Sequence, residues 1–231
     1  MSSLTRPLCR LTARRHSTNW SRKAKPLADM TCEAGLRPFH RRARRVLFPM
    51  FTRDVLLTLA DHGFFNPKWS ARIHAEWTGN LISRLRTSGA TEDRSARIDA
   101  VRRAMDRAFP DALIRNVPPD SGDVLPVDPK DRHVVMAAVA ARADAIVTFN
   151  LKDFAGDHLR CELAIEVLHP DVFVRDLIDL NEKRAAGAFR ELRARKRQPP
   201  WQAEELIDRA RRAGLLETAA WLEGEDVRRL L

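Results

Sequence analysis

Residues 128–154 read DPKDRHVVMAAVAARADAIVTFNLKDF, and this stretch decides the fold. An Asp-Pro pair followed by Asp131 is typical of a helix N-terminus, with an acid at the cap, proline in the first turn and an acid at the third position. The apolar residues that follow are small, so we expect the helix to pack closely against a neighbour. The apolar run Ala145–Thr148 then predicts a buried strand, and Leu151–Phe154 predicts a short turn after it.

The flanking sequence has the order of elements of an α/β domain. A second β-like run, Ala164–Leu168, follows the turn, and the order helix, strand, short helix, strand favours a parallel sheet. Upstream, apolar residues at helical spacing predict helices that begin at Thr52, Ser70 and Thr91. Pro118–Val127 is typical of a loop around a short strand. We therefore expect an α/β fold with a parallel sheet flanked by helices.

The last fifth of the chain has a different character. Beyond Asp179 the sequence is helical and highly charged, until a Gln-Pro-Pro sequence breaks the pattern before two further amphipathic helices. We place a domain boundary near residue 180. The α/β domain then covers residues 46–180, and residues 181–231 form a small helical extension.

The composition excludes several classes of protein. Of the 231 residues, 44% are apolar and 31% are charged, which is enough apolar sequence for a buried core. No stretch approaches the roughly 18 apolar residues of a membrane span. The three cysteines form no CxxC pair, which excludes a disulfide framework and a zinc ribbon. Since no apolar run suited to a secretory signal follows the first Met, we expect a cytoplasmic protein with no membrane partner.

The net charge of +10 comes from the N-terminal segment alone. Residues 1–45 contain twelve Lys and Arg but two acids, whereas residues 46–231 contain 29 basic and 29 acidic residues. Three interpretations remain open for residues 1–45: a disordered basic arm, a targeting segment, or non-native sequence from a misplaced start or a frameshift. Each of them predicts that residues 1–40 are largely unpacked and that trypsin trims the chain to a core starting near Arg45.

Acidic and amide side chains occur at the ends of the predicted elements. Asp128 and Asp131 open the helix before the buried strand, Asn150 and Asp153 follow that strand, and Glu76 lies inside an earlier helix. Each acid has an ordinary structural explanation, as a helix cap, a turn cap or a solvated surface group. As a set they lie where open parallel sheets bind ligands, and oxygen ligands suit Mg²⁺ or Mn²⁺. The residues alone therefore suggest metal-dependent phosphoryl transfer. We interpret His133 as a structural hydrogen-bond donor.

The same segments resemble the PIN-domain family, and they are most similar to its VapC-like branch of toxins from bacterial toxin–antitoxin pairs. The resemblance covers residues 46–180 and is most specific in the Thr-Phe-Asn-Leu-Lys-Asp-Phe sequence after the strand. It implies a PIN-like three-layer domain with a parallel sheet between helices. It also implies an RNA substrate, a cognate antitoxin as partner, and a homodimer as one assembly. The residues that carry it lie in the segments Phe51–Ala60, Phe64–Ser70, Glu76–Leu81, Arg107–Ala112, Asp128–Ala138 and Ala143–Phe154.

In that family a cluster of acids binds one or two Mg²⁺ or Mn²⁺ ions, which activate water to cut RNA. By position, the resemblance implies Glu76, Asp131 and Asp153 as catalytic residues. Asp128 and Asn150 join these three in the implied set of metal ligands. We expect the five side chains to converge in an acidic pocket at the carboxyl end of the parallel strands.

The sequence departs from the family pattern at its start. The family begins with a buried strand that ends in an aspartate, and the corresponding position here is Ala43. No acid lies between Glu33 and Asp54, and a proline and basic residues interrupt the preceding stretch, so it cannot be a central strand. Two functions remain open: a metal-dependent ribonuclease toxin impaired by loss of its first acid, and a non-catalytic PIN scaffold that binds an antitoxin or a second copy.

Overall fold

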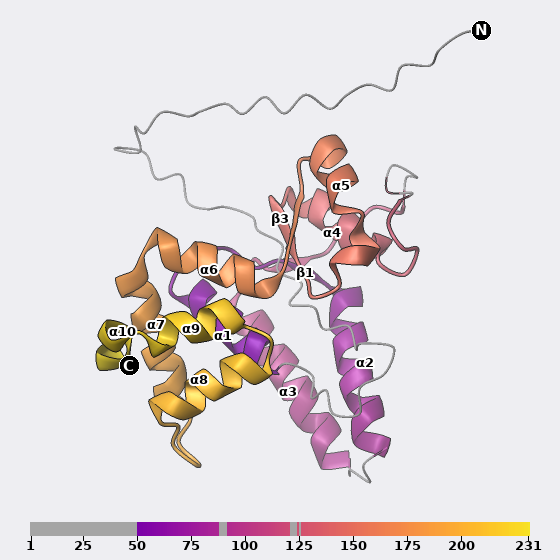
Figure 1. Cartoon of the computed structure of the whole chain (residues 1–231). Coiled ribbons are helices and arrows are strands. Elements are labelled where there is room, and N and C mark those ends of the chain that lie inside the picture. Colours follow the sequence, from indigo (N-terminus) through magenta and orange to yellow (C-terminus); the bar gives the residue numbers. More distant parts are fainter. Residues whose placement is uncertain (1–49, 88–91, 121–123, 125) are drawn as a thin grey trace, which may run out of the picture.

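The computed structural model describes residues 50–87, 92–120, 124 and 126–231. The basic segment 1–45, the Ala43 position and the Thr91 helix cap lie outside these residues. Figure 1 shows the order and placement of the elements. In chain order they are α1 (Met50–Asp61), β1 (Trp69–Ser70), α2 (Ala71–Thr87), α3 (Glu92–Ala108), β2 (Leu113–Ile114), α4 (Arg132–Ala141), β3 (Ala145–Val147), the 3₁₀ helix η1 (Leu151–Phe154), α5 (Gly156–Leu163), β4 (Glu166–Leu168), α6 (Pro170–Leu180), α7 (Glu182–Ala194), α8 (Ala203–Arg212), α9 (Leu216–Glu223) and α10 (Glu225–Leu230).

The described strands form two short parallel pairs. β1 pairs with β2, with Trp69 opposite Leu113, and β3 pairs with β4, with Ala145 opposite Glu166. Helix α4 contacts β1, β2 and β3, so the two pairs share one covering helix. The α/β class and the parallel pairing are therefore confirmed. The expected three-layer domain around one parallel sheet is not seen, because the strands of the described residues form two separate two-stranded sheets.

Local sequence signals predicted several boundaries correctly. The Ser70 hydroxyl accepts a hydrogen bond from the backbone N–H of Ile73 at 3.3 Å, so Ser70 caps α2 as expected. Strands β3 and β4 fall within the two predicted β-like runs. The helix predicted from Thr52 begins two residues earlier, at Met50, and the Thr52 hydroxyl is buried inside it.

Two other expectations were wrong. The described residues of Pro118–Val127 form no strand, and the short strand of this region lies earlier, at Leu113–Ile114. Helix α4 begins at Arg132 with Asp131 as its N-cap, rather than at Asp128. The reason is local: the Asp128 carboxylate accepts the backbone N–H of Lys130 at 2.9 Å, which closes a turn before the helix starts.

Two apolar cores hold these elements together. One core contains Trp77, Ile146 and Phe154 and lies between α2, α3, α4 and the β3 region. The other joins α1 to helices α6–α9 and includes Leu56 and Phe189. Figure 1 shows α1 among the C-terminal helices, and α2 and α3 side by side as a hairpin that extends from them. The second core thus combines the first described helix with the last ones, while the domain boundary near residue 180 stays a prediction.

The length and hydropathy of the described helices decide whether any of them could cross a membrane. Among the described residues, no helix combines 18 residues with the apolar character that crossing a bilayer requires.

Candidate functional site

The turn before α4 positions two of the predicted acids. Asp131 is the N-cap of α4 and its side chain is fully buried, with 0% of the residue exposed. It occupies the N-cap position rather than the third helical position that the sequence suggested, and its side chain makes no capping bond. The backbone carbonyl of Asp128 accepts the Asp131 N–H at 2.8 Å, which fixes the spacing of the two residues. Because a carboxylate is rarely buried unless it is paired or functional, Asp131 is a candidate functional residue.

The segment after β3 positions the next two side chains. The backbone N–H of Asn150 donates to the Thr148 hydroxyl at 3.1 Å, which turns the chain at the end of the strand. The Asn150 amide then donates to Oδ2 of Asp153 at 2.5 Å. The backbone N–H of Asp128 donates to the carbonyl of Asp153 at 2.8 Å. Asp128, Asn150 and Asp153 are therefore neighbours, as the sequence predicted from their positions at element ends.

Glu76 approaches this region from α2. Its Oε1 lies 3.3 Å from Nε2 of His133 and 3.7 Å from Nε of Arg72, one turn earlier on the same helix. The Nδ1 of His133 bonds to the carbonyl of Lys130 at 2.9 Å, and a carbonyl can only accept, so Nδ1 carries a proton. His133 is a structural donor, as expected. Its other ring nitrogen, Nε2, is buried and faces Glu76 without forming a hydrogen bond.

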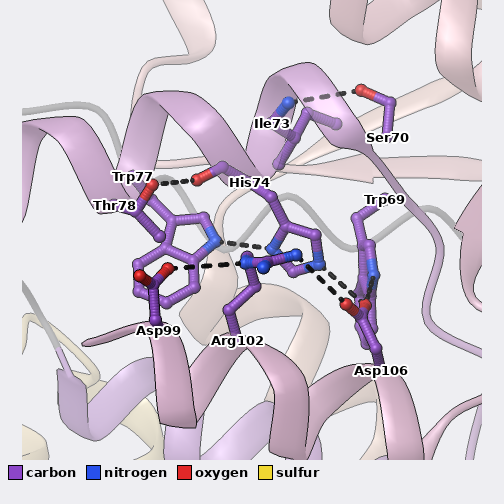
Figure 2. Close-up of polar contacts among 9 residues, drawn as sticks. All are labelled: Trp69, Ser70, Ile73, His74, Trp77, Thr78, Asp99, Arg102 and Asp106. Atoms are coloured by element: carbon purple, nitrogen blue, oxygen red, sulfur yellow. Dashed lines mark hydrogen bonds and ion pairs between the residues drawn. The ribbon is translucent and has the colours of Figure 1, made fainter. Parts of the chain in front are cut away.

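A buried polar network fixes α2 against α3 and β1 (Figure 2). Oδ1 of Asp106 accepts the indole N–H of Trp69 at 3.0 Å and lies 2.9 Å from Nε2 of His74. The indole N–H of Trp77 donates to Nδ1 of His74 at 2.9 Å. Because Glu76 lies between His74 and Trp77 in α2, the network sets the rotation of this helix and the direction in which Glu76 points.

The network also determines the protonation of its histidine. An indole N–H can only donate, so Nδ1 of His74 accepts, and the proton of the neutral ring is on Nε2, facing Asp106. Burial lowers the pKa of His74 below its ordinary value of 6.5, against the opposing effect of Asp106. The ring is therefore a neutral bridge between two helices at neutral pH.

The predicted set is only partly assembled. The described contacts join Asp128, Asn150 and Asp153 to one another, and they join Glu76 to His133. Among the residues that the structure describes, no three His, Cys, Asp or Glu side chains are grouped closely enough to hold a metal ion. The described side chains thus do not fit the Mg²⁺ or Mn²⁺ site that the resemblance implies, and no catalytic step through a metal follows from them.

Sequence reasoning missed the residues that position the acids. Asp106 lies 32 residues after His74, and no local pattern connects them. The one usable signal was the spacing of His74 and Trp77, three residues apart on a predicted helix, where side chains meet.

Two families of known proteins match the chain. Residues 47–152 match the PIN domain, and residues 170–224 match the VapC50 C-terminal domain. The PIN-domain match covers a little under half of the chain, so the chain is similar to that family over residues 47–152. Its C-terminal helices are similar to the VapC50 C-terminal domain, which follows the PIN-domain match along the chain.

The protein named "Putative ribonuclease VapC50" from Mycobacterium tuberculosis is 42% identical over 79 residues, which are 34% of this chain and 46% of that protein. The chain therefore spans about half the length of the relative it matches. No solved structure matches the chain. Glu76, Asp128, Asp131 and Asn150 lie within the PIN-domain match, and Asp153 follows its last residue by one position.

Proposed function

We propose that the chain is a VapC-like ribonuclease of impaired activity, with RNA as its substrate. The observation that carries the proposal is the PIN-domain match over residues 47–152, which contains the fully buried Asp131. We assign Glu76, Asp131 and Asp153 as the catalytic acids, with Asp128 and Asn150 beside them. Mg²⁺ or Mn²⁺ is the ion that we expect an intact site to require.

The proposed impairment has a physical cause. The affinity of an oxygen site for a dication depends on its charge count, and Ala43 supplies no carboxylate where the family has an aspartate. The nearest acid that follows cannot replace it, because Asp54 is engaged elsewhere. Its Oδ2 lies 2.7 Å from Nζ of Lys196, at the junction of α1 with the segment after α7. We therefore expect cleavage of RNA to be feeble or absent, even with Mn²⁺.

A second candidate function is a non-catalytic PIN scaffold that binds a cognate antitoxin or a second copy of the chain. The observation that favours it is the lack of a three-membered metal-binding group among the described side chains. In this alternative the acids remain as structural groups. Repair of the site would then not restore cleavage.

The test is to repair the first strand. Residues 1–45 are replaced by a family-type strand that ends in Asp, and cleavage of total RNA is measured over a Mn²⁺ titration. Small misplacements of catalytic groups cost about 100-fold in rate, so we expect the repaired chain to cut at least about 100-fold faster than the unaltered chain. The single change Ala43→Asp restores the carboxylate without the strand that aims it, and we expect partial recovery at most.

The control is the repaired chain with Asp131→Asn, which keeps the shape of the buried side chain and removes its charge. Circular dichroism should show the same helix content for both repaired chains, while the variant loses the regained cleavage. A repaired, folded chain that cuts no RNA at any Mn²⁺ concentration would contradict the nuclease proposal and favour the scaffold.

A further inference from the structure

A cavity of about 400 Å³ opens beside the candidate site. Its walls include Ser70 and Ile114, the last residues of the parallel strands β1 and β2, and His133 and Met136 of α4. Ligands of parallel sheets bind outside the carboxyl ends of the strands. Nε2 of His133, in the cavity wall, lies 3.3 Å from Oε1 of Glu76. The cavity is thus adjacent to a proposed catalytic acid.

The polar lining of this cavity is mainly cationic. Arg72, Arg115 and Arg132 line it, and Asp120 is the one acid among the lining residues, which leaves a formal charge of +2 without His133. Nη1 of Arg132 lies 3.1 Å from Oδ2 of Asp120, and its Nε donates to the carbonyl of Val127 at 3.1 Å. Arg132 is therefore held in the wall, while the Arg72 side chain is 62% exposed. Within the described part of the chain, Arg115 has no acidic partner.

The remaining lining offers no amide group and no Phe or Trp ring for a nucleobase. It consists of proline, aliphatic and small side chains, with no Asn or Gln to read a base edge and no Phe or Trp to stack on a base. His133 has the one aromatic ring, and its two nitrogens face Lys130 and Glu76. A cavity lined by arginines and without a stacking ring suits a phosphate.

We propose that this cavity binds a phosphate group of the RNA strand, with Arg72 and Arg115 as its contacts and Arg132 as a fixed part of the wall. The inference rests on the proposed function, because RNA supplies the phosphate. Phosphate contacts position a strand without carrying sequence information. The cavity therefore holds RNA beside Glu76 irrespective of the base at that position.

The test measures binding without cleavage. Fluorescence anisotropy of a labelled single-stranded oligouridylate is followed with the full chain in EDTA over a series of salt concentrations. The double variant Arg72→Gln/Arg115→Gln is compared with Arg103→Gln/Arg190→Gln, which removes the same charge from exposed positions on α3 and α7. The basic N-terminal segment is present in both, so its contribution cancels.

We expect the cavity variant to bind more weakly than the control variant. Each phosphate neutralised on a single strand contributes about 0.7 to the slope of log K against log salt, so the loss of this one site should make the slope shallower by about 0.7. Oligoadenylate should give the same difference. Equal affinities and slopes for the two folded variants would overturn the proposal.

A second arm identifies the source of the phosphate. If uridine 5′-monophosphate raises the melting temperature of the control variant alone while both variants bind RNA equally, the cavity takes a free nucleotide and the RNA assignment is overturned. The cleavage test and the binding test can fail independently, so failure of the proposed function is distinguishable from failure of the cavity proposal. Absence of cleavage by the repaired chain leaves the binding difference in EDTA intact, and cleavage with equal binding overturns the cavity proposal alone.

Discussion

Two buried aspartates have different roles in this molecule. Asp171 on α6 is 6% exposed, and its carboxylate accepts the backbone N–H groups of Glu217 and Thr218 at 2.8 and 3.0 Å and the Thr218 hydroxyl at 2.7 Å. It therefore caps the first turn of α9 from a distant helix. Asp131 is also buried but does not cap the helix that it precedes. The structural role of Asp171 is explained by its bonds, whereas Asp131 is the residue we assign to function.

Asp171→Asn should destabilise the protein. The amide replaces one accepting oxygen by a donor, which leaves a buried N–H of α9 without its acceptor and costs about 1–3 kcal/mol. Urea unfolding at pH 7 measures this loss. Asp176→Asn is the control on the same helix, because Asp176 is exposed. Partial desolvation of its carboxylate and the nearby charge of Asp179 raise the pKa of Asp176, so removing this charge should cost little. Equal losses for the two variants would contradict the capping role.

At the scale of elements, the orientation of α2 depends on α3. Asp106 receives N–H groups from Trp69 of β1 and His74 of α2, so one carboxylate joins three elements (Figure 2). Arg102 of α3 lies 3.8 Å from the other oxygen of Asp106. This clamp holds the helix that carries Glu76 in the proposed site.

Asp106→Ala should be costly because it leaves two buried N–H donors unsatisfied. We expect a loss of about 2–4 kcal/mol in the free energy of unfolding, measured in urea. Asp99→Ala is the matched control, because Asp99 lies on the same helix and pairs with the same Arg102 but its side chain is 53% exposed. Its loss should stay below about 1 kcal/mol. A similar loss for both would show that the clamp contributes nothing beyond a surface ion pair.

The elements also show which parts of the fold a sequence can predict. The cap at Ser70 and the strands β3 and β4 follow from patterns within a few residues, and these predictions were confirmed. The contacts that orient the site join residues far apart, such as His74 with Asp106 and Asp171 with Thr218. Propensity and periodicity carry no information on such pairs, so the positioning of Glu76 was not predictable.

In the candidate site, too, only contacts between adjacent elements could be predicted from the sequence. Asp128, Asn150 and Asp153 were expected to be neighbours because they end adjacent elements, and their contacts agree with this. The start of α4 was misplaced because Asp128 and Asp131 are both acceptable caps by sequence, and the Asp128 carboxylate instead closes a turn with Lys130 before the helix. The link from His133 to Glu76 joins two helices and has no local signal.

At the scale of the whole molecule, the C-terminal helices complete the core around α1. Nε2 of His62 lies 2.7 Å from Glu191, and Nη2 of Arg195 lies 2.7 Å from Asp61. Phe189 of α7 and the buried residues of α1 also belong to the same apolar core. We therefore expect the α/β region to depend on the helical extension for its stability.

A chain that ends at Leu180 should not unfold cooperatively, because it exposes the apolar face of α1. Thermal unfolding by near-ultraviolet circular dichroism measures this. Full-length Glu191→Gln removes the surface ion pairs with His62 and Arg195 and should remain folded, with a loss of at most about 1 kcal/mol for each pair. A shortened chain with a sharp transition near that of the full chain would show that residues 181–231 are independent of the rest.

The most direct test of the central claim is the chelator-sensitive cleavage of RNA by the unaltered chain. We propose that the chain is a VapC-like nuclease with catalytic acids at Glu76, Asp131 and Asp153 and no carboxylate at position 43. The proposal predicts little or no cleavage of total RNA by the unaltered chain with saturating Mn²⁺, at the level that the Asp131→Asn variant gives. Strong cleavage that EDTA stops and Asp131→Asn abolishes would contradict it, because the site would then be complete without the first aspartate.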